Sequence, residues 1–255
     1  MALSILSIGI LVNAFISATV AGAAFALTYA LFRRRRQQTP TTEAYTWFWW
    51  FTALVWSFSA LRYIAVSFGY VGVWVGYSDI LVQASVFLGG PPLFYYLLTR
   101  VFANRRLAAF GSLLSLIASL VALGFALRQG GIPLDDVTPF SAEATINVRS
   151  FTIFGAEIAL IVPIAIFDIV HRLRNWIKKR NQTVLYDALQ TVPLLLYVLL
   201  GTIDESKVIT SWPLVVFRIL YVAGFLFVYI IITQEEAEQT DYFVTKSETT
   251  TTYAQ

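Results

Sequence analysis

Five polar residues lie inside stretches of sequence that are otherwise apolar: Arg62, Asp79, Gln83, Glu157 and Arg218. Each of these stretches is long enough to cross a bilayer. Measured along a helix, each polar residue lies within about 10 Å of the end of its stretch that is expected on one and the same side of the membrane. Charges inside a membrane are tolerated when opposite charges compensate them. Two arginines and two carboxylates at one depth therefore predict a polar cavity for an ion or small ligand, with Arg62–Asp79 and Arg218–Glu157 as ion pairs.

An alternative interpretation gives these charges only a structural role. They would then hold helices together, or Arg62 would extend to the outer lipid headgroups. The sequence has no nucleophile elbow, zinc-protease motif or P-loop, so an enzyme would need two intramembrane carboxylates acting together. We assign no catalytic residue and predict that the protein is not an enzyme.

The composition indicates an integral membrane protein that crosses the bilayer several times. Of 255 residues, 58% are hydrophobic and 13% are charged, and the mean hydropathy is +0.69. The absence of Cys excludes disulfides and thiolate metal sites. A single histidine, His171, excludes bis-histidine haem and most zinc or di-iron sites. We predict no metal site, no covalent cofactor and no nucleic-acid partner.

The elements that must position the five polar residues are predicted helices. We expect an all-α bundle of seven transmembrane helices in residues 1–233, followed by a polar, disordered tail in residues 234–255. Four prolines within these helices are expected to break them, and a mid-helix proline pair frees backbone carbonyls that neighbours must satisfy. These are Pro91, Pro92, Pro163 and Pro193. The expected spans are 4–32, 44–68, 78–102, 107–127, 150–170, 186–203 and 211–233.

Several smaller expectations concern the ends and faces of these spans. The loop 128–149 is long enough to fold over the bundle as a lid or hairpin. Asp168 is expected at a solvated helix end, with proton exit as the alternative, and the basic segment after it is expected to extend the helix beyond the membrane. Small residues in the first span (Ala14, Ala18, Ala21 and Gly22) suit close helix packing. The aromatic residues are expected mainly at the membrane interfaces and facing lipid.

The distribution of Lys and Arg in the short loops predicts the orientation. Twelve lie on one side and three on the other, so the positive-inside rule places the N-terminus outside and the C-terminus in the cytoplasm. The expected location is the plasma membrane. The basic inner loops would contact anionic lipid and offer a surface to a cytoplasmic or membrane protein partner. The twelve are residues 33–36, Arg100, Arg105, Arg106, Arg172, Arg174, Lys178, Lys179 and Arg180; the three are Arg128, Arg149 and Lys207.

Some local sequence resembles the microbial rhodopsins, a family of seven-helix proteins with the same expected orientation. The shared features are Gly69-Tyr70, Gly90-Pro91-Pro92-Leu93 in place of a Thr-Thr-Pro-Leu break, Pro193, and Val222-Ala223-Gly224-Phe225. This register puts Val222 at the retinal-lysine position and Arg218 at the counterion position. The resemblance thus implies an opsin-related protein without a Schiff base. The stretch 91–97, PPLFYYL, is also similar to part of the bacterial seven-helix sensor domains, which would need a separate effector here.

The positions of the lysines exclude covalent retinal independently of any resemblance. The four lysines are Lys178, Lys179, Lys207 and Lys246, and none falls inside an expected span. Any lipophilic ligand, such as a carotenoid or retinoid, would bind non-covalently.

The sequence leaves three functional hypotheses. The first is a seven-helix receptor, sensor or opsin-related protein that binds a ligand in its outer half. The second is a transporter or channel for an ion or small solute, which would need a polar path through the inner half as well; spans 4, 6 and 7 look nearly bare there. The third is a non-catalytic structural subunit of a membrane complex.

Overall fold

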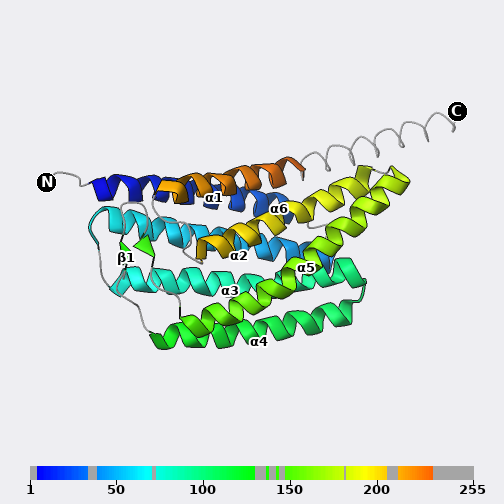
Figure 1. Cartoon of the computed structure of the whole chain (residues 1–255), viewed down its shortest axis with the longest axis horizontal. Helices are drawn as coiled ribbons and strands as arrows, with labels where there is room; N and C mark the ends of the chain where they lie inside the picture. The colour runs from blue at the N-terminus through cyan, green and yellow to red at the C-terminus, as the bar shows by residue number, and fades with distance from the viewer. Residues whose placement is uncertain are drawn as a thin grey trace.

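The computed structural model describes residues 5–33, 39–70, 73–129, 136–137, 142–143, 147–180, 182–205 and 212–231. The predicted tail, 234–255, and the charged residues Lys207 and Lys246 lie outside this part. The described helices alternate in direction along the bundle, and two short strands lie in the connection between α4 and α5 (Figure 1). They are α1 (Ile5–Arg33), α2 (Pro40–Ser67), α3 (Val73–Phe102), α4 (Arg105–Gln129), β1 (Asp136–Val137), β2 (Ala142–Glu143), α5 (Val148–Lys179), α6 (Gln182–Glu205) and a last helix, Trp212–Ile231.

The predicted all-α class is confirmed, apart from one two-stranded hairpin. Six of the described helices are long and apolar enough to cross a membrane: α1, α3, α4, α5, α6 and the last helix. This is the make-up of an integral, multi-pass membrane protein. Helix α2 is long enough but less apolar than these six, because amphipathic Trp and Tyr side chains occupy much of its first half.

Local signals extend several helices beyond the predicted spans. Helix α2 begins at Pro40, with Thr39 as its N-cap accepting a hydrogen bond from the Thr42 amide. It ends in a turn at Gly69, whose φ of 82° favours glycine. Helix α3 then starts at Val73, inside the stretch predicted as a turn. Helix α5 continues through the basic segment to Lys179, as expected, and at about 1.5 Å per residue its 32 residues cover roughly 48 Å.

Consecutive helices from α1 to α6 pack against one another, and α5 also contacts α3. Helix α5 is inclined across the others, running from the far end of α4 to the start of α6 (Figure 1). This path brings α5, α6 and the last helix against the α2–α3 pair. The space that these five helices enclose is where the predicted polar residues meet.

The loop between α4 and α5 carries the predicted hairpin, which the structure confirms as an antiparallel pair of β1 and β2. Ala142 of β2 is fully buried against α1, α2 and α3, in a cluster with Ile10, Tyr63 and Val75. We call this the hairpin end of the bundle. It contains the start of α1, the end of α2 and the start of α3.

The prediction that Pro91, Pro92, Pro163 and Pro193 break their helices is wrong. The first two lie inside α3, the third inside α5 and the last inside α6. A helix survives a proline when a neighbour satisfies the carbonyl four residues earlier. The carbonyl that Pro91 cannot bond is that of Phe87, and Ser119 of α4 donates to it at 2.7 Å.

We expect Ser119→Ala to destabilise the protein by about 1–3 kcal/mol, because the Phe87 carbonyl would be left buried without a donor. The matched control is Ser85→Ala. Ser85 is also buried, but its hydroxyl donates only to the Leu81 carbonyl of its own helix, so its loss should change stability by less than about 0.5 kcal/mol. Unfolding in mixed detergent–SDS micelles measures both. Equal losses would contradict the role given to Ser119.

The expectation that aromatic residues mainly face lipid is wrong for α2. Tyr45 and Trp49 are almost completely buried, and Tyr45 stacks on Tyr96 of α3 with ring centroids 4.6 Å apart. Trp49 packs edge-on against Phe225 of the last helix. An aromatic run of this density fills the centre of a bundle because flat, rigid rings bury large areas. Trp47, by contrast, is exposed on the surface of the bundle.

The small-residue face predicted for the first span is only partly buried. Ala14 and Ala21 pack into the bundle, whereas Ala18 and Gly22 are exposed. The side of α1 that faces α2 carries larger residues as well, including Ile10 and Leu27.

Candidate functional site

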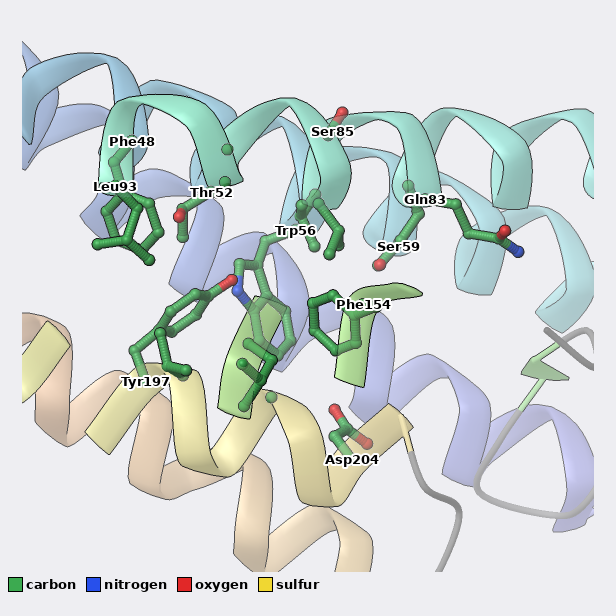
Figure 2. A pocket seen from close by; sticks show the side chains of 18 of the residues that line it. Phe48, Thr52, Trp56, Ser59, Gln83, Ser85, Leu93, Phe154, Tyr197 and Asp204 are labelled. Atoms are coloured by element: carbon green, nitrogen blue, oxygen red, sulfur yellow. The ribbon is translucent and has the colours of Figure 1, made fainter. Parts of the chain in front are cut away.

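A cavity of about 110 Å³ lies between α2, α3, α5, α6 and the last helix (Figure 2). At roughly 10–15 Å³ per enclosed water, this is room for several waters or a small organic molecule. The five site residues predicted from sequence all line it: Arg62, Asp79, Gln83, Glu157 and Arg218. The structure therefore brings together residues that lie up to 156 positions apart in the chain.

The first charged group in the cavity joins α2 to α3. Arg62 forms an ion pair with Asp79, and Gln83, one turn further along α3, donates from Nε2 to the other Asp79 oxygen at 2.8 Å. Both members of the pair are buried. The predicted pair Arg62–Asp79 is thus present, because the short turn between two antiparallel helices brings these positions to the same depth.

The second charged group corrects a prediction. Arg218 of the last helix pairs with Asp204 of α6, not with Glu157; its Nη2 and Nε lie 3.2 and 3.3 Å from the two carboxylate oxygens. Arg218 also donates to the hydroxyl of Tyr63. Asp204 was predicted to lie in a loop after residue 203, but α6 continues to Glu205 and keeps this side chain in the bundle.

Tyr63 connects the two groups. Its ring lies 5.3 Å from the Arg62 guanidinium and 5.2 Å from that of Arg218, which is the range of cation–π contact. Because Tyr63 is fully buried at the hairpin end, it holds both cations in place.

Glu157 has a different environment from the other two carboxylates. It accepts a 2.8 Å hydrogen bond from the Ser115 hydroxyl of α4. None of the ion pairs among the described residues includes it. Gly90 of α3 gives it space: a Cβ there would lie 3.1 Å from Ser115 Oγ and 3.2 Å from Glu157 Oε2.

The rest of the cavity wall combines aromatic rings with aliphatic, glycine and hydroxyl residues, and a few of its polar atoms have no partner. Figure 2 shows the rings of Trp56, Phe154 and Tyr197 gathered between the α2–α3 pair and α6. Within the described part of the chain, three buried lining atoms have no hydrogen-bond partner: Trp56 Nε1, Arg62 Nε and Gln83 Oε1. Buried polar atoms are normally paired, so these atoms mark positions where a bound molecule or water would be held.

A second polar cluster, which sequence reasoning missed, lies at the end of the bundle opposite the hairpin. Asp168 of α5 accepts from Arg100 Nε of α3 at 2.9 Å, from Arg172 Nε at 2.8 Å and from Thr191 of α6 at 2.8 Å. Asp187 of α6 pairs with both arginines. We call these five residues the arginine network. It joins α3, α5 and α6.

The network corrects the prediction for Asp168, which is 2% exposed rather than at a solvated helix end. Arg100 and Arg172 were interpreted only as charges that set orientation, and Asp187 was not considered. The available signal was depth: Asp168, Asp187 and Arg100 all lie within two residues of the same end of their predicted spans. The part of α6 at this end of the bundle is therefore not bare of polar groups.

An aromatic cluster separates the cavity from the network. Phe48 and Tyr197 line the cavity and pack edge-on, with ring centroids 5.9 Å apart. Tyr45 and Tyr96 stack further along the bundle, and Arg100 of the network lies 5.0 Å from the Tyr96 ring. The cavity thus ends on aromatic rings rather than continuing to the opposite end.

The side chains that line the cavity can bind a small molecule. Its polar groups are two guanidinium groups, three carboxyl groups, an amide and hydroxyls, set in an apolar and aromatic wall. This is the make-up of a small-molecule site with a few orienting polar groups. Neither the protein-family models nor the curated proteins searched include a match to the chain.

Proposed function

We propose that the protein is a seven-helix membrane receptor or sensor that binds a small ligand in the polar cavity. The observation that supports this most is the cavity itself: a charged pocket at one end of the bundle, closed towards the other end by aromatic rings. A pocket that none of the arginine-network residues lines suits detection of a ligand better than its passage through the bundle. The wall can accept a small or partly lipophilic molecule.

We further propose that α2 is a seventh transmembrane helix, with the N-terminus outside and the C-terminus in the cytoplasm. Buried residues recur along all of α2, and its charge Arg62 is compensated by Asp79. The excess of Lys and Arg lies at the end of the bundle opposite the hairpin. The cavity would then face the exterior of a plasma membrane, and the arginine network would face the cytoplasm.

In this orientation the signal would leave through the basic cytoplasmic end. The network joins the inner ends of α3, α5 and α6, so a ligand that shifts these helices would change the surface offered there. A cytoplasmic or membrane protein partner would bind the changed surface, and anionic lipid around the arginines would assist that binding.

A transporter is the second candidate, and the arginine network favours it. A transporter needs polar groups in both halves of the membrane, and the network supplies them in the inner half through Asp187 and Thr191 of α6. The aromatic cluster would then be a gate between two polar regions. Glu157, an intramembrane carboxyl without a cation, would carry a coupling proton or ion.

Two further interpretations stay as proposals of lower rank. An opsin-related protein without a Schiff base would use the cavity for a non-covalent retinoid or carotenoid; Val222, at the lysine position of that resemblance, packs against the apolar core. A structural subunit of a larger complex would use exposed helix faces, such as that of α1 around Ala18 and Gly22.

Cysteine labelling separates receptor from transporter, because the native chain has no Cys. Ser59 of α2 lines the cavity. We expect Ser59→Cys, in membranes, to react with a membrane-impermeant thiosulfonate added from outside and not with the same reagent added from inside. Reaction from both sides would favour the transporter and contradict a closed inner half.

Three controls make that experiment decisive. Ala53→Cys on the same helix is fully buried in the core and should not react from either side. Tyr70→Cys, in the exposed turn after α2, should react only from outside. Arg105→Cys, at the exposed start of α4, should react only from inside. Labelling of the last two on the same side would refute the proposed topology.

A further inference from the structure

Among the described residues, the charges that line the cavity do not balance. Two guanidinium groups face three carboxyl groups in this part of the chain. Arg62 is matched by Asp79 and Arg218 by Asp204, each in a direct ion pair. Glu157 is the remaining carboxyl, and in the described part of the chain its one polar partner is the neutral hydroxyl of Ser115. An ionised carboxylate buried without a cation is strongly unfavourable. The Glu157 carboxyl group must therefore either bind a cation or carry a proton.

The surroundings of Glu157 suit one kind of positive partner. Phe154 precedes it by three residues and lies on the same face of α5. The rings of Trp56 and Tyr197 also line the cavity (Figure 2), as does the ring of Tyr221. Aromatic faces attract cations, and cages of several rings bind ammonium groups. A carboxylate that shares a cavity with such rings can recognise both the charge and the apolar substituents of an organic cation.

Two further observations indicate that the cavity has room for such a cation and a hydrogen-bond acceptor for it. Gly90 leaves the Oε2 side of Glu157 free of a side chain, since a Cβ there would lie 3.2 Å from this oxygen. Gln83 Oε1, on a residue that is 9% exposed, is an acceptor without a partner in the described structure and lines the same cavity. An ammonium group has donors for such acceptors and accepts none.

We propose that the cavity binds a small organic cation with N–H donors, a protonated amine, with Glu157 as its counter-charge and the rings of Trp56, Phe154 and Tyr197 around it. This rests on the proposed ligand-binding function and names the class of ligand. A metal ion is disfavoured because, in the described part of the chain, Ser115 Oγ is the one side-chain oxygen that contacts Glu157, whereas hard cations take a shell of oxygen ligands. A phosphate or carboxylate ligand would find both arginines already paired.

The test uses the purified full chain in nanodiscs and three probes of one shape: benzylamine, benzyl alcohol and benzoate. Binding is followed by tryptophan fluorescence and by the rise in Tm, up to about 10 mM, since one charge-assisted contact supplies affinities near the millimolar range. We expect benzylamine to bind at least about tenfold more tightly than benzyl alcohol, and benzoate not to bind.

Variants assign the effect to Glu157. Glu157→Gln should weaken benzylamine binding about tenfold to a hundredfold and leave benzyl alcohol unchanged. The matched control is Glu43→Gln, which removes an exposed carboxylate at the start of α2 and should change nothing. Gly90→Ala keeps every charge but crowds Glu157 Oε2, and should also weaken benzylamine, so the test does not depend on the folding of one variant.

Each other outcome overturns the proposal in a recognisable way. Equal binding of benzyl alcohol and benzylamine would refute the cation preference while leaving a ligand cavity in place. Preferential binding of benzoate would show that the arginines dominate. If no probe binds and Glu157→Gln is as stable as the wild type, Glu157 simply carries a proton. Labelling of Ser59→Cys then decides separately whether the proposed receptor function survives.

Discussion

Asp168→Asn is expected to destabilise the protein by about 3 kcal/mol, one of the two largest effects that the structure predicts. The substitution keeps the shape of the side chain but removes the charge that faces Arg100 and Arg172. Removing one member of a buried ion pair typically costs about 3–5 kcal/mol. The value should lie at the lower end because Asp187 still contacts both arginines. Unfolding in mixed detergent–SDS micelles measures it.

The matched control for this prediction is Asp187→Asn. The Asp187 side chain is 37% exposed, against 2% for Asp168, and its backbone carbonyl keeps a hydrogen bond from Arg100 in the variant. Solvent screening should hold its cost to about 1 kcal/mol or less. If the two variants lose the same stability, the network is not organised around Asp168. Adding Arg172→Leu to Asp168→Asn should recover part of the loss, because two guanidinium groups then no longer share Asp187 as their one carboxylate in the network.

The second large effect is the coupling between Arg218 and Asp204. Arg218→Leu leaves Asp204 without its cation, and Asp204→Leu leaves Arg218 without its carboxylate, so each is expected to cost about 3 kcal/mol. The double variant should lose at least about 1 kcal/mol less than the sum of the two, because neither charge then remains unpaired. The free energy of unfolding of the four proteins gives the coupling directly.

The same cycle with Glu157 provides the control. Arg218 and Glu157 share the cavity but no contact, so Arg218→Leu and Glu157→Gln should combine more nearly additively. Stronger coupling of Arg218 to Glu157 than to Asp204 would mean that the helix order around the cavity differs from the one described. It would also remove the unbalanced charge on which amine binding depends.

Depth in the membrane could be predicted from the sequence, whereas rotation around the bundle could not. Counting residues from the ends of the apolar stretches placed five residues at one level, and all five line one cavity. For Arg62 and Asp79 depth was sufficient, because a short turn makes α2 and α3 neighbours. For Arg218 several carboxyl groups lay at a similar level, and only the packing of α6 against the last helix selects Asp204.

The remaining errors came from giving a residue one role when it has two. Arg100 and Arg172 mark the basic side of the chain, and the positive-inside rule accounts for them without any partner. Asp168 and Asp187 in turn look like the solvated ends of α5 and α6. The network could not be predicted without knowing that α5 is inclined across the bundle, which brings Asp168 and Asp187 together. The prolines were treated as breaks for a similar reason, since the rescuing hydroxyl of Ser119 lies on another helix.

The arginine network has a consequence for how the bundle can move. Arg100 is held by carboxylates from two different helices, so sliding either α5 or α6 along α3 separates at least one ion pair. These three helices therefore behave as a single rigid body at that end. A conformational change along the bundle must therefore either rotate the other helices around α3, α5 and α6 or break the ion pairs that join these three. In the second case, breaking the ion pairs would be the slowest step of the change.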